Sequence, residues 1–223
     1  MPKRDHYDAV VVGAGPNGLA AAIALGRQFN AVLLLEAAKT IGGGSRSAEL
    51  TLPGFHHDVC SAVQPLSLAS PFFRQLDLPQ YGLEWIQPEI PLAHPFEDGS
   101  ALFLHRSLEI TADAMGDDGK AYKILLQPFV NGEQRLLADI LKPLGFPASP
   151  FLMARFAFHA LRSLKNLVET KFKSDRTRTL FAGLAAHAMI PLEQTATAAF
   201  GIVLATLAHT VGWPIIRGGS QKL

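Results

Sequence analysis

A short apolar run near the N-terminus begins the pattern of hydrophobic and polar positions. Residues 9–12 are continuous and largely β-branched, and they end at a glycine, which predicts a strand buried on both faces, as in a parallel sheet. Small apolar residues at 19–29 predict a helix, and Pro16 falls where that helix would begin. A second apolar run at 31–35 ends on an acid, Glu36. The pattern therefore predicts a strand–helix–strand unit.

Further short apolar runs predict small strands. They are separated by prolines and by turn residues such as Asp98-Gly99. The candidate strands are residues 48–52, 83–86, 90–94 and 101–104. We expect the last three to form a small antiparallel sheet.

From Ser107 onward the spacing becomes helical. Ser107 is an expected N-cap of a helix that ends near Gly116. The other predicted helices are residues 70–76, 121–141 with an interruption at Pro128, and 150–168, opened by Ser149-Pro150.

The stretch between Glu193 and Arg217 has no charged side chain, apart from His209 when it is protonated. A membrane-spanning helix needs about 20 apolar residues. Several threonines dilute this run, and Pro191 and Pro214 bracket it, so we expect a buried helix. A transmembrane helix is the less favoured interpretation.

These elements predict an α/β chain with a Rossmann-like start, a small mixed sheet and a mainly helical portion. The expected segments are residues 1–52, the Rossmann-like start; 53–106, strands and loops; 107–213, a helical cap; and 214–223, a return segment.

Composition narrows the functional classes. The chain has 223 residues, 48% hydrophobic and 17% charged, and its net charge of +1 gives no reason to expect nucleic-acid binding. The single cysteine, Cys60, excludes an internal disulfide and favours a reducing compartment such as the cytoplasm. Residues 1–7 are too short and polar for a signal peptide. Residues 165–178 hold five basic side chains and two acids; we interpret them as a solvated helix end and loop, and peripheral membrane contact stays open.

The glycines after the first strand form a G-x-G-x-x-G motif. Gly13 permits a tight turn, Gly15 lets a pyrophosphate approach the backbone, and Gly18 lets the helix lie close to the strand. The helix N-terminus supplies free N–H groups and a positive dipole end. Glu36 lies eighteen residues after Gly18, where an acid can accept hydrogen bonds from ribose hydroxyls and repel a 2′-phosphate. The alternative is a glycine-rich turn without a ligand. It is disfavoured because the first strand, the helix, the second strand and the acid that ends it all occur at the spacing of the motif.

A second glycine cluster, residues 42–46, separates flavin from nicotinamide. Its glycines allow another close approach of the backbone, and Arg46 can pair with a phosphate. The arrangement resembles the FAD-binding start of the amine oxidase and phytoene desaturase group of flavoproteins. Residues 54–58, Gly-Phe-x-x-Asp, and residues 211–221, with Pro-x-x-Arg-Gly-Gly-Ser, resemble further segments of that group.

The resemblance implies FAD as the cofactor and a longer parent protein, of which this chain would be an N-terminal portion. A second flavin contact of the family, a Gly-Asp motif, has no counterpart after Gly219, which puts catalysis by this chain alone in doubt. No catalytic residue is identified. The expected cofactor-binding residues are Gly13, Ala14, Gly15, Pro16, Asn17, Gly18, Glu36, Ala37, Gly43, Gly44 and Arg46, with Gly218 and Gly219 as weaker candidates.

Two other groups of residues can be interpreted either as a site or as plain structure. His56, His57, Asp58 and Cys60 could ligate a metal, but they lack the paired spacing of a zinc site, so we favour a structural or cofactor-adjacent strand. The aromatic residues of the middle region could line a lipophilic pocket, although plain core is favoured. They are Trp85, Phe96 and Phe103.

The expected function is FAD-dependent dehydrogenation or desaturation of a lipophilic small molecule, with hydride transfer to the flavin. One alternative is an NAD-dependent dehydrogenase, which the first glycine motif allows and residues 42–46 disfavour. Another is a truncated nucleotide-binding module without catalysis, and a complementing chain could supply the missing half. The substrate, the electron acceptor and a homodimer stay open.

Overall fold

The computed structural model describes residues 6–223, which divide into two compact units, each assembled from separate stretches of chain. The α/β unit comprises residues up to Gln64, Leu76–Ile86 and Ile215–Leu223. The helical unit comprises Pro65–Gln75 and Gln87–Pro214. The predicted α/β class is confirmed. The four segments expected from the sequence were defined by the role expected of each, whereas the two units are defined by contacts within the structure. The four segments therefore stay a prediction.

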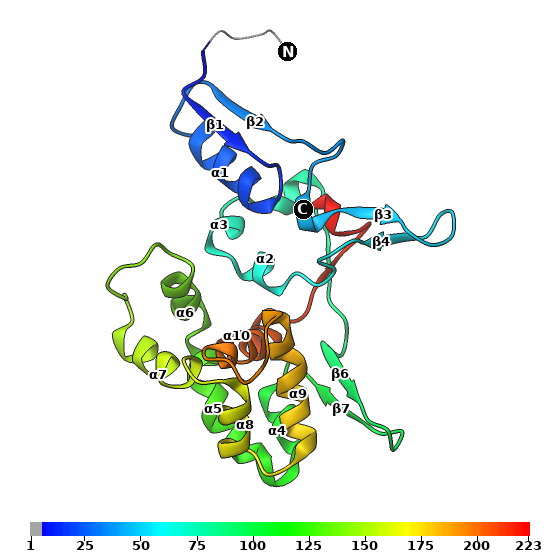
Figure 1. The fold of residues 1–223 in the computed structure, drawn as a ribbon, viewed down its shortest axis with the longest axis vertical. Helices are drawn as coiled ribbons and strands as arrows, with labels where there is room; N and C mark the ends of the chain where they lie inside the picture. The colour runs from blue at the N-terminus through cyan, green and yellow to red at the C-terminus, as the bar shows by residue number, and fades with distance from the viewer. Residues whose placement is uncertain (1–5) are drawn as a thin grey trace. The chain divides into compact units, whose positions relative to one another are not determined.

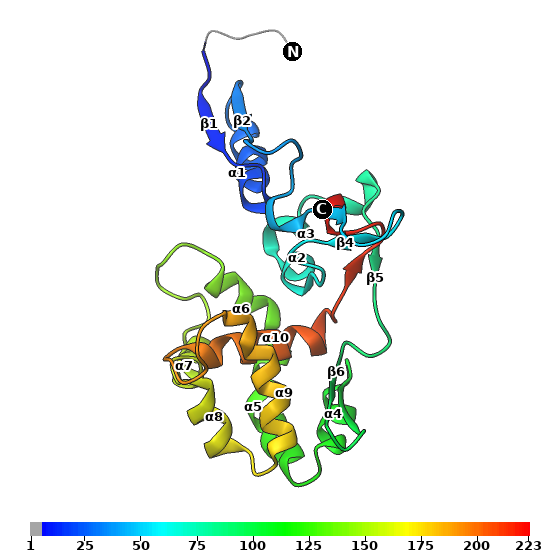
Figure 2. The ribbon, with the colours of Figure 1, turned by 45° about the vertical axis from the view of Figure 1, so that its right-hand side comes forward.

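The strand–helix–strand start of the chain is confirmed. Strand β1 (Ala9–Val12) pairs in parallel with β2 (Val32–Leu35). Helix α1 (Pro16–Gly26) connects them and lies against the pair, as Figures 1 and 2 show. Pro16 is in its first turn, as expected, but the helix ends at Gly26 instead of Phe29, because residues 27 and 28 form a turn.

Burial of β1 on both faces is wrong for the described chain. Val10 and Val12 are 54% and 81% exposed, and they share one face of the strand. Among residues 6–223, β2 is the only strand that pairs with β1, and one helix covers one face of a two-stranded sheet.

The rest of the α/β unit consists of small elements. Strands β3 (Ser47–Glu49) and β4 (His56–Asp58) form an antiparallel hairpin, so the strand predicted at 48–52 ends early. Strand β5 (Trp85–Ile86) pairs with β8 (Ile215–Ile216). The expected three-stranded sheet is therefore wrong, because β5 pairs with the return segment. The 3-10 turns are η1 (Gly43–Ser45), η2 (Leu78–Tyr81) and η5 (Ser220–Lys222).

The helical unit surrounds one buried helix. Its elements are α2 (Pro65–Ala69), α3 (Pro71–Arg74), the hairpin β6 (Leu92–Pro95) and β7 (Ala101–Leu104), α4 (Leu108–Ala114), η3 (Gly116–Asp118), α5 (Gly119–Asn131), α6 (Glu133–Ile140), α7 (Pro150–Ala160), α8 (Leu164–Lys171), α9 (Asp175–Ala185), η4 (Ala186–Ala188) and α10 (Thr197–Thr210). The helix predicted at 70–76 is the shorter α3, and α2 was not predicted. Ser107 caps α4 as expected, and its Oγ accepts from Ile110 N at 3.2 Å.

Helix α10 is the centre of this unit. It contacts α5, α7, α8 and α9, and Figure 1 shows it among them. Ten of its residues are buried, which confirms the predicted buried helix. Gly201 permits the close packing, because a Cβ there would lie 3.2 Å from Leu164 Cδ1 and 3.4 Å from Phe181 Cδ1. Within the described chain, no helix combines the length and the apolar character needed to cross a bilayer.

The predicted helix break at Pro128 is wrong, because α5 continues through Pro128 to Asn131. A proline has no N–H to donate to the carbonyl four residues earlier, here that of Ile124. Arg155 Nη2 donates to the Ile124 carbonyl oxygen instead, at 3.0 Å. A contact from α7 thus replaces the lost helical bond, and the break falls at Gly132.

The single helix predicted for 150–168 is also wrong. Helix α7 ends at Ala160, and Ser163 caps a new helix, α8, by accepting from Asn166 N at 3.2 Å. Thr197 Oγ1 accepts from Leu164 N at 2.8 Å, which fixes the first turn of α8 from the start of α10.

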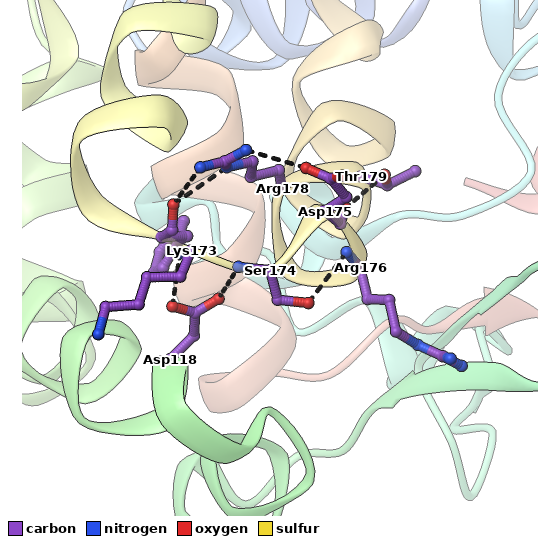
Figure 3. Close-up of polar contacts among 8 residues, drawn as sticks. Asp118, Lys173, Ser174, Asp175, Arg176, Arg178 and Thr179 are labelled. Carbon is purple, nitrogen blue, oxygen red and sulfur yellow. Dashed lines mark hydrogen bonds and ion pairs between the residues drawn. The ribbon is translucent and has the colours of Figure 1, made fainter.

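The basic stretch at 165–178 includes a hydrogen-bonded turn between α8 and α9 (Figure 3). The buried carboxylate of Asp118 accepts from Lys173 N and Ser174 N, both at 2.8 Å. Arg178 pairs with Asp175 at 2.9 Å, and Arg176 with Asp98 at 3.3 Å. Lys165 also lies 3.9 Å from Glu193, so three of the five cations are in ion pairs, which favours the interpretation of a solvated helix end.

Candidate functional site

The turn after β1 brings two of the predicted glycines together. Gly13 has φ +98°, and its N–H donates to Leu35 O at 2.7 Å, so the turn is anchored to the end of β2. A Cβ at Gly18 would overlap the Gly13 carbonyl oxygen and lie 3.0 Å from its carbon. Glycine at 18 is therefore what lets α1 lie against the turn.

The N-terminus of α1 is suited to an anion. Gly15 is its N-cap and has extended backbone angles (φ −75°, ψ 175°), and no side chain caps the helix. Pro16 takes the first helical position, and the first turn contains no acid. The N–H groups of this turn and the dipole of the helix can therefore stabilise an anion, and no acidic side chain of the turn itself competes with it. Asn17 is exposed beside them.

The second glycine cluster touches the first. Gly42 N donates to Ala14 O at 2.8 Å, and Ala14 is fully buried at this junction. Gly43 has φ +53°, and a Cβ there would lie 2.9 Å from Gly15 Cα. The two predicted segments are therefore packed backbone against backbone, and glycines at 15 and 43 make this approach possible.

Glu36 is exposed beside this junction. Its Oε2 accepts from Ala14 N at 2.7 Å and its Oε1 from Ala38 N at 2.8 Å. The hydrogen bond from Ala38, then that from Ala14, lowers the pKa of the carboxyl below its usual value, with further lowering by Ala37 N–H and the Arg46 charge. The group is ionised at neutral pH, and each oxygen keeps a lone pair for a hydroxyl donor.

Arg46 closes the second cluster. Its Nε donates to Gly43 O at 2.8 Å, across the 3-10 turn η1, and the residue is partly exposed. Gly44 is exposed in this turn and its carbonyl accepts from Ser61 N at 3.1 Å. The guanidinium keeps further N–H groups for a second acceptor, and phosphate is an anion that its fork of donors fits.

A group of residues that sequence reasoning gave no role fastens the return segment to the β3–β4 hairpin. Asp58 Oδ1 accepts from Ser47 Oγ at 2.6 Å, from Ser220 N at 2.7 Å and from Ser220 Oγ at 2.9 Å. Gln221 Oε1 accepts from Ser47 N at 3.2 Å. We call Ser47, Asp58, Ser220 and Gln221 the Asp58 latch. The residue types were visible in the sequence, but their pairing across 162 positions was not.

The latch places Gly218 and Gly219 beside β3. Gly219 has φ +96°, and a Cβ there would overlap the Ser47 hydroxyl. Gln221 Nε2 also donates to Ile41 O at 3.4 Å, next to the second glycine cluster. Contact of Gly218 and Gly219 with a cofactor stays a prediction.

The structure adds no support for a metal site at β4 or for a pocket lined by aromatic residues. The histidines of β4 have nearby partners: His57 Nε2 lies 2.8 Å from Thr51 Oγ1 and His56 lies 3.6 Å from Glu49. No group of three metal-ligating side chains occurs among residues 6–223. Of the aromatic residues expected in a core, Phe103 is 40% exposed, because it points away from the face of β7 that buries its neighbours.

Comparison with known proteins finds sequence likeness in the first part of the chain. Residues 11–76 match the family described as NAD(P)-binding Rossmann-like domain. A subunit of the limonene dehydrogenase of Castellaniella defragrans is 30% identical over 115 residues, covering 52% of this chain and 21% of that protein. Pyridine nucleotide-disulfide oxidoreductase domain-containing protein 2 of Mus musculus is 35% identical over 112 residues, covering 49% and 19%.

Solved structures extend the likeness over the whole chain at the level of fold. Putrescine oxidase bound to putrescine aligns with 97% of this chain and 47% of its own, with a TM-score of 0.57 and 19% identity. A fatty acid isomerase from P. acnes that produces CLA aligns with 96% and 47%, with a TM-score of 0.55 and 16% identity. The chain thus spans about half the length of these structures, and the matched part is about a fifth of the curated relatives.

The predicted resemblance to amine oxidase-related enzymes is confirmed at the level of fold by putrescine oxidase. The Rossmann-like start predicted from Gly13, Gly15, Gly18 and Glu36 is confirmed by the family match. Residues 11–76 of the chain thus match the family described as NAD(P)-binding Rossmann-like domain, the chain is similar in sequence to part of a limonene dehydrogenase subunit, and it shares the fold of about half of putrescine oxidase.

Proposed function

We propose that the α/β unit binds the FAD of an oxidoreductase that acts on a lipophilic small molecule. The observation that carries this proposal is the junction of the two glycine segments at the N-terminus of α1. Gly42 N–H bonds to Ala14 O there, and Gly43 packs on Gly15. A nicotinamide fold needs the first segment alone, whereas two segments offer backbone N–H groups to a diphosphate from two sides.

The residues present fit FAD. A Cβ at Gly15 would meet only the Gly43 backbone, at 3.6 Å from its Cα, so the remaining space beside Gly15 is open to a phosphate. Glu36 would hold the ribose hydroxyls, and its ionised carboxylate would reject a 2′-phosphate. Arg46 and the first turn of α1 would hold the diphosphate. The bound flavin supplies the hydride acceptor, and the protein positions it.

A lipophilic substrate is supported by the relatives. One is named for limonene and another for a fatty acid, both of which are largely hydrocarbon, while the structure of putrescine oxidase was solved with putrescine, an amine. We expect no catalytic side chain among the residues of the junction, which act by binding and orienting the cofactor.

The test is flavin binding by the purified chain. We expect that the chain, loaded with FAD and desalted, retains visible flavin absorption, and that Glu36→Ala weakens retention, because the ribose hydroxyls lose their acceptor. NADP should not displace the flavin. Colourless wild-type protein after desalting would refute FAD binding by this chain.

The description of the matched family favours a second candidate, NAD binding at the same junction. The two candidates differ in one titration: if NAD quenches protein fluorescence and FAD does not, the chain is a nicotinamide-binding module. Retained flavin that no reductant or substrate reduces would instead support a nucleotide-binding module without catalysis.

A further inference from the structure

The outer face of α7 is unusually apolar for an exposed helix. Phe151, Phe158 and Leu161 are 90%, 70% and 64% exposed. Their spacing places them on one side of the helix, opposite the buried Phe156 and Ala160. Single exposed apolar residues are normal, but a stripe along a helix marks an interaction surface.

The loop before α7 also exposes large apolar side chains. Leu144 is fully exposed and Phe146 is 86% exposed. The buried carboxylate of Asp139 holds the loop: it accepts from Ala148 N at 2.8 Å and Ser149 N at 2.9 Å, and it pairs with Lys142 at 2.7 Å. Figures 1 and 2 show this loop between α6 and α7 at the edge of the helical unit. Because its backbone is held, the loop can present its apolar tips with little ordering on binding.

Charge identifies the surface that would cover these residues. The chain between Ile140 and Val168 contains four cations and no carboxylate. Lys142 and Lys165 pair with carboxylates from outside this stretch. Arg155 and Arg162 donate to neutral oxygen atoms, so their charges are not offset by an ion pair among the described residues. The partner should therefore have a negatively charged surface above an apolar interior.

We propose that this surface docks on an anionic lipid bilayer. It consists of Leu144, Phe146, Phe151, Phe158 and Leu161 and is called the α7 surface below. An interfacial helix inserts aromatic residues and leucines to about the level of the acyl chains, while its arginines contact anionic headgroups. The proposal does not depend on FAD binding. It also moves the membrane contact from residues 165–178, whose arginines are paired, to α7.

The test is co-sedimentation of the purified chain with vesicles of phosphatidylcholine, with and without phosphatidylglycerol. We expect binding to the anionic vesicles, weakened by salt, because the two arginines add a screened attraction. The double variant Phe151→Ser/Phe158→Ser should bind about a hundredfold more weakly, at roughly tenfold for each buried phenylalanine. The matched control, Phe103→Ser, removes an exposed aromatic residue from β7 and should bind like the wild type.

A second readout does not depend on loss of binding. In the variant Phe151→Trp, the new indole should shift its emission to the blue on anionic vesicles and be quenched by brominated lipids. Absence of that shift, or equal sedimentation of the double variant and the wild type, overturns the proposal. So does a wild-type dimer that the double variant converts to a monomer without any vesicle binding, since the α7 surface would then be an interface between copies of the chain.

Discussion

Three glycines of one helix should respond differently to alanine, because the structure gives each a different neighbourhood. Gly15 lies at the N-cap of α1, Gly18 in its first turn and Gly26 at its last position. All three substitutions add one methyl group. The comparison therefore separates space needed by a ligand from space needed by the fold.

The expected magnitudes follow from what each new Cβ would meet. At Gly18 it overlaps the Gly13 carbonyl, and backbone cannot yield cheaply, so we expect a loss of about 3 kcal/mol of unfolding free energy, the upper end for overpacking. At Gly26 nothing lies within 4 Å, and alanine should add about 0.5–1 kcal/mol, as glycine is a poor helix former. At Gly15 the contact is an ordinary 3.6 Å, and we expect a change within about 0.5 kcal/mol.

FAD affinity should follow a different order. Gly15→Ala places a methyl group where the diphosphate must approach the backbone, and we expect a loss of about ten- to a hundredfold, the value of one charge-assisted hydrogen bond. Gly26→Ala should bind like the wild type. Urea unfolding followed by circular dichroism measures stability, and flavin retention after desalting measures binding.

Two results would refute this reasoning. If Gly15→Ala retains FAD as the wild type does, the diphosphate does not lie at the N-terminus of α1. If Gly18→Ala is as stable as the wild type, the close contact between α1 and the Gly13 turn is not required by the fold.

Three further predictions concern the rest of the molecule. Asp58→Ala removes the oxygen that accepts from Ser47 and Ser220, so it should release Ser220 and make the return segment sensitive to limited proteolysis; unchanged cleavage would contradict the Asp58 latch. Tyr122→Phe should cost about 1–3 kcal/mol of unfolding free energy, because the buried His209 Nε2 loses its partner at 2.6 Å, and an unchanged urea midpoint would count against that bond. The Lys142 ammonium and two backbone N–H groups lower the pKa of Asp139 to about 2, so its contribution to stability should be full above about pH 4 and be lost as pH falls through 2; Asp139→Asn should lack this acid dependence in thermal unfolding.

The start of the fold and the core of the candidate site were predictable because their signals are local. Gly13, Gly18 and Glu36 lie within one strand–helix–strand unit, and each residue type has a steric or electrostatic reason to be there. Spacing alone therefore located the turn, the helix start and the acid after β2.

The errors share a different cause, which is contact between distant residues. Helix α5 continues through Pro128, where Arg155 supplies a donor to the Ile124 carbonyl oxygen. No local sequence pattern shows this contact. The pairing of β5 with β8 likewise joins residues 85–86 and 215–216, so the apolar run at 83–86 could not reveal its partner. Such contacts are decided by packing, which outweighs local propensity.

The division into units has a consequence for how the chain folds during synthesis. The strand–helix–strand start can form as soon as β2 leaves the ribosome, whereas Ser220 can reach Asp58 only after 162 further residues have been made. Closing so long a loop is entropically costly unless the residues between are already compact. The helical unit, whose main part is one continuous stretch from Gln87 to Pro214, should therefore fold before Ser220 binds Asp58. In this order of events the latch closes only after the β3–β4 hairpin and the helical unit have formed.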